Sequence, residues 1–144
     1  MNTLSELIKE WIEHNQTAEN MLDEYEVIMS EDQDVIDPPH ILIAEVGSET
    51  RQDGGVQMDG VEDHFFEITL VDLPVEELDG GTLPADHRKA AKSLSCILRS
   101  PNFRPYIDRH GWRVFDIRVT APQFSSNEGR RGSTSQVEIT ALEL

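Results

Sequence analysis

The spacing of apolar residues changes several times along this 144-residue chain, and these changes constrain the fold more than any other feature. Apolar residues at intervals of three and four predict an amphipathic helix, whereas short apolar or alternating runs predict strands. Helical spacing follows residue 3 and returns in residues 84–99. Four runs are predicted as strands: residues 40–46, 63–73, 115–121 and 136–142. The chain therefore reads helix, strand, strand, helix, strand, strand.

This order predicts an α+β fold, in which a mostly antiparallel four-stranded sheet packs against two main helices. The length is that of one domain, residues 1–144. Asp37-Pro38-Pro39 ends the element before it, because proline lacks a backbone donor and restricts the preceding residue. We therefore distinguish an acidic helical N-terminal segment, residues 1–37, from a sheet-plus-helix core, residues 38–144.

The first helix has a start signal. Thr3-Leu-Ser-Glu6 has the spacing of a capping box, and an apolar stripe follows it. Residues 18–25 have apolar side chains that predict a further turn or two of helix. In the later helix, Cys96 lies among apolar residues, so we expect a buried structural thiol.

Alternation within the strands predicts which side chains face the core. In the second strand Phe66, Ile68 and Leu70 share one face. In the last two strands the predicted sets are Phe115, Ile117, Val119 and Ala121, and then Val137, Ile139 and Ala141.

Two polar stretches, Gly47–Gly60 and Pro122–Ser135, are predicted as long loops, the first of them alternatively a hairpin arm. Loops of this length in a small domain are usually functional or disordered. If they are ordered, we expect contacts from outside the single chain to hold them.

Acidic and basic residues are separated along the chain. Residues 1–80 contain 22 of the 28 Asp and Glu and only two basic residues, a net charge of −20, whereas residues 81–144 have a net charge of +4. This separation favours a subunit that meets a copy of itself front to back, or a protein that presents one acidic surface. Tight binding to naked nucleic acid is disfavoured, because carboxylates repel phosphates.

The chain has no recognisable catalytic, cofactor or metal-binding motif, so we predict that it is not an enzyme and has no cofactor. Glu62-Asp63-His64, beside Asp59, is interpreted as a solvated turn at a strand entrance, with a weak cation site as the alternative. The start of the chain predicts no secretory signal, and no apolar run approaches the length of a membrane helix. We expect synthesis in a cytosol, which the single cysteine also fits.

Two basic clusters are candidates for a subunit interface. Arg130 and Arg131 stand in a polar stretch, and Arg88, Lys89 and Lys92 line one side of the second helix. Each cluster is alternatively an ordinary solvated surface. As interface residues they would contact an acidic surface, of which the N-terminal half of a neighbouring copy is the obvious candidate.

Several features together resemble the tail-terminator and related head-to-tail joining proteins of tailed bacteriophages. They are the length, the order of elements, the Ala-rich helix 85–98, the following aromatic connector to Trp112-Arg-Val-Phe-Asp-Ile-Arg-Val119, and the terminal strand 136–142. The resemblance covers most of the chain from His40 onward. The acidic stretch 21–37 departs from the family pattern.

The resemblance implies a structural virion protein at the tail-tube end or neck. Such proteins form rings, commonly hexameric, that contact tail-tube and neck or connector proteins, and their sheets line a channel through which DNA passes. The five basic residues named above would then lie at the inter-subunit seam. The alternative is an acidic DNA-mimicking or immunity-type inhibitor of a nucleic-acid enzyme, for which the acidic half would supply the charge.

Overall fold

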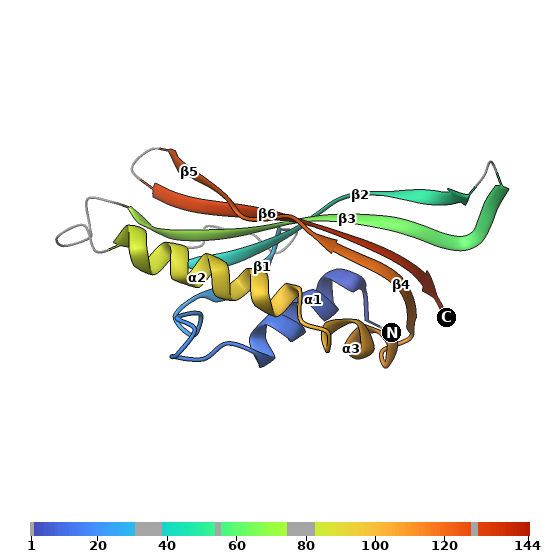
Figure 1. The fold of residues 1–144 in the computed structure, drawn as a ribbon, viewed down its shortest axis with the longest axis horizontal. Helices are drawn as coiled ribbons and strands as arrows, with labels where there is room; N and C mark the ends of the chain where they lie inside the picture. Colours follow the sequence, from blue (N-terminus) through green and yellow to red (C-terminus); the bar gives the residue numbers. More distant parts are fainter. Residues whose placement is uncertain (1, 31–38, 54–55, 75–82, 128–129) are drawn as a thin grey trace.

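The computed structural model describes residues 2–30, 39–53, 56–74, 83–127 and 130–144. Within these residues, six strands form one sheet and three helices lie against one side of it (Figure 1). The helices are α1 (Leu4–His14), α2 (Leu83–Leu98) and α3 (Phe103–Asp108). The strands are β1 (Glu26–Met29), β2 (His40–Asp53), β3 (Val56–Pro74), β4 (Trp112–Val119), β5 (Gln123–Asn127) and β6 (Arg130–Glu143).

The strand order is β1-β2-β3-β6-β4, and β5 pairs with the first part of β6. The neighbours β2, β3, β6 and β4 are antiparallel, whereas β1 runs parallel to β2. The predicted fold class, a mostly antiparallel four-stranded sheet with two main helices and two long loops, is therefore wrong: the sheet is mixed and has six strands, and a third, short helix accompanies α1 and α2.

Both predicted loops contribute strands, and for the first of them the alternative prediction, a hairpin arm, is confirmed. Gly47–Gly60 carries the outer part of β2 and the start of β3, and Pro122–Ser135 carries β5 and the first part of β6. A strand ladder uses backbone groups that every residue except proline provides, so a Ser-, Glu- and Gln-rich stretch pairs as well as an apolar one when a partner strand lies beside it. For Pro122–Ser135 the polar composition of the side chains did not indicate this pairing.

The acidic N-terminal segment is helical only at its start. Helix α1 ends at His14, and the predicted continuation through residues 18–25 is a series of turns in which Met21 has a left-handed φ of 62°. The Gln16 side-chain amide donates to the carbonyls of Leu22 and Tyr25, both at 2.7 Å. Strand β1 follows, because Val27 and Ile28 are buried beside β2.

The start of α1 is confirmed. The Thr3 hydroxyl accepts a hydrogen bond from the Glu6 backbone N–H at 3.2 Å, which satisfies one of the unpaired donors of the first turn. Leu4, Leu7, Ile8 and Ile12 form the buried stripe. The neighbouring Trp11 donates from its indole nitrogen to the Ile97 carbonyl at 2.9 Å and so ties α1 to α2.

The inward face of the sheet is confirmed for β3 and β6: Phe66, Ile68, Leu70, Val137, Ile139 and Ala141 are all buried. Strand β4 differs from the prediction because its register shifts between Val114 and Asp116. This bulge turns Val114 into the core and leaves Phe115 exposed. After the bulge, Ile117 and Val119 pack against the core as predicted.

Helix α2 packs through Ala90, Ala91, Leu94 and Leu98. The prediction that Cys96 is buried is wrong, since its side chain is exposed and Ser95 takes the buried position. One apolar cluster joins the helices to the inward face of the sheet, and its members range from Leu4 to Ala141.

Candidate interaction surfaces

The face of the sheet opposite the helices is polar and acidic. Alternation and the strand registers place on it the residues between those of the apolar core. Among the side chains that the structure describes, its charged members are five carboxylates and two arginines: Glu49, Asp63, Glu67, Asp116, Glu138, Arg113 and Arg118. We call this surface the outer face. No helix covers it within the described residues (Figure 1).

Two contacts fix carboxylates on the outer face. The Thr140 hydroxyl donates to Asp63 Oδ1 at 2.5 Å across the β3–β6 pair. On β4, Arg118 Nε lies 2.9 Å from Asp116 Oδ2, and both side chains are about half exposed or more. Because exposed ion pairs are worth only about 0–1 kcal/mol, the second contact orients the charges more than it stabilises the fold.

A shallow hollow of about 570 Å³ crosses the outer face over four strands. Its lining includes Val46 from β2, Phe65 from β3, Glu138 from β6 and Arg118 from β4. An apolar floor edged by opposite charges is suited to contact with another macromolecule.

The sheet has two free edges at the same end. Strand β1 pairs with β2 only as far as Ile43, so β2 from Ala44 to Asp53 has a neighbour on one side alone among the described residues. At the opposite edge, β4 pairs only with β6 within that same part of the chain. Unpaired strand edges are ready to pair with another chain.

The structure places the predicted interface residues on two sites. Arg88, Lys89 and Lys92 are exposed on α2, and the Arg88 guanidinium lies 5.6 Å from the centre of the Phe124 ring. The backbones of Arg130 and Arg131 pair with β5 at the start of β6, while their side chains lie outside the described residues. The α2 cluster therefore lies on the helix side of the molecule, away from the outer face.

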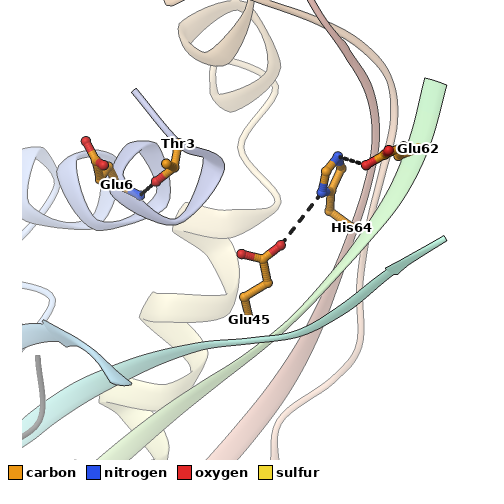
Figure 2. Close-up of polar contacts among 5 residues, drawn as sticks. All are labelled: Thr3, Glu6, Glu45, Glu62 and His64. Atoms are coloured by element: carbon orange, nitrogen blue, oxygen red, sulfur yellow. Dashed lines mark hydrogen bonds and ion pairs between the residues drawn. The ribbon is translucent and has the colours of Figure 1, made fainter. Parts of the chain in front are cut away.

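The predicted turn at Glu62-Asp63-His64 is wrong, since all three residues lie within β3. Alternation sends Asp63 to the outer face, whereas His64 lies on the inward side between two carboxylates (Figure 2). His64 Nδ1 is 3.9 Å from Glu45 and Nε2 is 3.8 Å from Glu62. No metal-binding group of side chains occurs among the described residues, and the side chain of Asp59 lies outside them.

A buried polar cluster under the sheet was not predicted. The Tyr25 hydroxyl and His87 Nδ1–H both donate to the carboxylate of Asp72, and all three side chains are buried. His87 Nε2 has no hydrogen-bond partner within the described residues. One signal was present in the sequence: Asp72 continues the inward alternation of Phe66, Ile68 and Leu70, so a carboxylate at that position required buried donors.

Tyr106 on α3 joins the helices by a second polar contact. Its hydroxyl donates to Glu10 Oε2 at 2.9 Å. Burial, this hydrogen bond and the nearby negative charge raise the pKa of Tyr106 from 10.0 to about 12. The contact couples α3 to α1 on the side of the sheet away from the outer face.

No helix in the described part of the chain is long and apolar enough to span a membrane. No protein-family model and no curated protein matches this sequence.

Proposed function

We propose that this chain is a structural virion subunit that assembles into a homo-oligomeric ring at the tail-tube end or neck of a tailed phage. The observation that carries the proposal is the one-sided sheet: helices bury one face, and the described side chains of the other, the outer face, include five carboxylates and two arginines. In the ring, outer faces line the channel and helices lie outside.

An acidic channel suits the passage of DNA. Phosphates that approach the carboxylates of the outer face are repelled, so the duplex moves through without adhering to the wall. The proposed role requires no bond to be made or broken by the protein. Its mechanism is geometric, because a repeated head-to-tail contact closes into a ring when the rotation between copies divides a full turn.

The predicted basic residues are candidates for contacts between subunits of the ring. Arg88, Lys89 and Lys92 on α2, with Arg130 and Arg131, would contact the acidic N-terminal half of a neighbour or the surrounding tail and neck proteins. Charges of this kind set orientation and the rate of association, while apolar burial and strand pairing supply most of the affinity. Reversing Arg130 and Arg131 to Glu is expected to weaken self-association.

Light scattering coupled to size-exclusion chromatography, at low and high salt, tests the assembly. We expect a closed oligomer whose mass gives the copy number, with six as the family resemblance implies, and electron micrographs should show rings. A chain that stays monomeric at every salt and protein concentration contradicts the proposal. A monomer that instead binds a basic nuclease would support the alternative, an acidic inhibitor that mimics DNA.

The charge of the channel is tested separately. Glu67→Lys with Glu138→Lys adds positive charge to the outer face, and the ring of this variant is expected to retain duplex DNA that the unmodified ring releases. Glu67→Gln with Glu138→Gln is the matched control, since it changes the same two side chains of the outer face without adding positive charge. Equal retention by the two variants would show that the outer face does not line the channel.

A further inference from the structure

The two free edges of the sheet lie in register at one end of the molecule. Across the sheet, Glu49 is opposite Asp63, Asp63 is opposite Thr140, and Thr140 is opposite Asp116. The free part of β2 and the whole of β4 therefore bound the same four-stranded band, β2-β3-β6-β4. A band with two exposed edges at one level can continue into a copy on either side.

Strand direction fixes how two copies would meet. Every neighbouring pair in the band is antiparallel, so β2 and β4 of one chain run in opposite directions. Copies in a ring are related by rotation about the ring axis, so a given strand has the same direction relative to that axis in every copy. The β4 edge of one copy therefore meets the β2 edge of the next as an antiparallel pair, and the up-down alternation continues without interruption.

Each free edge carries one exposed large apolar residue at a bulge. On β2 the register shifts between Glu45 and Gly47, and Val46 at this point is 55% exposed. On β4 the shift lies between Val114 and Asp116, and Phe115 is 40% exposed. A bulge leaves one residue unpaired in the ladder and reorients its side chain, so both residues are available to a neighbour.

The hollow of the outer face reaches the free edge of β2 at Val46. Its volume is about 570 Å³. At this edge its lining includes Val46 and Ser48 from β2 and Phe65 from β3. A protruding apolar side chain on one surface and a hollow on another make a head-to-tail contact, as closed rings require.

The charges of the two edges are also complementary. The free part of β2, Ala44–Asp53, contains three acidic residues and one arginine, whereas β4 contains two arginines and one aspartate. On β4 the Arg113 guanidinium lies 5.7 Å from the centre of the Phe115 ring. The acidic edge of β2 in a second copy would therefore lie near the positive charge of Arg113 when it buries Phe115.

We propose that the subunit seam is an antiparallel pairing of β4 with the free edge of β2 in a second copy, staggered along the strands by about three to four residues so that Phe115 of one chain enters the hollow beside Val46 of the next. This inference rests on the proposed ring and names the contact that closes it. The seam joins the bands of all copies into one continuous sheet around the channel.

Disulfide trapping tests the seam on the full chain in solution. In a Cys96→Ser background, which removes the exposed native thiol, Val46→Cys combined with Phe115→Cys is expected to form a ladder of covalent multimers under mild oxidation. Each single substitution can form no more than a dimer. Val46→Cys with Phe124→Cys is the matched control, because Phe124 is 50% exposed but lies on β5, outside the band.

We expect the seam pair to give at least tenfold more covalent multimer than the control pair. As a second measurement, Phe115→Asp should shift the oligomer to monomer at concentrations where Phe124→Asp stays assembled, with unchanged circular dichroism. If rings form but the seam pair and the control cross-link equally, the seam is wrong and the ring stands. If light scattering shows monomers alone, both proposals fail.

Discussion

The inward face of the sheet carries Phe66, Ile68 and Leu70 beneath the helices, whereas the outer face of the same strand carries Phe65, Glu67 and Thr69 with no helix over it in the described residues. The two sets alternate residue by residue along β3. Removing apolar area from water, at about 25 cal/mol per Å², stabilises mainly the inward set, because its side chains are buried whereas those of the outer set are only partly buried. The outer face can therefore change without unfolding the protein, which leaves its charges free to serve a partner or a channel.

The largest difference between the faces is expected for adjacent phenylalanines on β3. Phe66→Ala should lower the free energy of unfolding by about 3–5 kcal/mol, because it leaves a cavity in the core. Phe65→Ala should cost less, about 1–2 kcal/mol, since the side chain is only partly buried and lines the open hollow. Urea unfolding followed by circular dichroism compares them, and equal losses would show that the outer face is covered.

Two aspartates of β3 also differ between the faces, since Asp72 is buried on the inward face and Asp63 lies on the outer face. Asp72→Ala should cost about 2–4 kcal/mol, because it leaves the buried donors of Tyr25 and His87 without their acceptor. Asp63→Ala, on the outer face, removes one part-buried hydrogen bond from Thr140 and should cost about 1 kcal/mol. The same urea titration measures both, and a smaller loss for Asp72→Ala than for Asp63→Ala would contradict the buried cluster.

A milder change concerns the helix that covers the inward face. Thr3→Ala should lower the free energy of unfolding by about 1 kcal/mol, because the Glu6 N–H loses its capping acceptor. Thr3→Ser keeps a hydroxyl at the cap and should retain most of the stability. Thermal unfolding detects the difference. An alanine variant as stable as the serine variant would show that the Thr3 cap does not stabilise the protein.

The smallest effect is expected at Tyr106, where the fold itself stays intact. Its pKa of about 12 lies above the ordinary 10.0, so the protonated phenol is favoured in the folded state: the contribution to stability is present below pH 10 and is lost as the pH rises through about 12. Glu10→Gln should lower this pKa, while Glu13→Gln should leave it unchanged. Ultraviolet absorbance of the phenolate follows the titration, and equal curves would exclude Glu10 as a cause.

The helical parts of the fold were the most predictable from the sequence. The cap at Thr3, the buried stripe of α1 and the packing face of α2 depend on spacing within one short segment, and all three occur as predicted except for the exposure of Cys96. The inward residues of β3 and β6 were predictable for the same reason. Polar strands were less predictable, because β5 and the outer part of β2 pair with the strand that follows each of them through backbone groups, and this pairing requires no apolar pattern of side chains.

The candidate surfaces were less predictable than the core. Charge separation along the chain indicated an acidic surface, but only the strand registers gather Glu49, Asp63, Glu67, Asp116 and Glu138 on one face, since they come from four strands. The exposure of Phe115 depends on a bulge in β4 that no composition signal marks. The cluster of Tyr25, Asp72 and His87 likewise joins residues far apart in the chain.

By itself, the sequence determined where the apolar faces of its helices and inner strands lie, because side-chain period and capping are local properties of the chain. Tertiary structure decided that both polar segments contribute strands, which edges are unpaired among the described residues, and which charges share the outer face. The physical reason is that backbone pairing accepts almost any residue, so the partner strand and its register, and not the side chains, select the pairing.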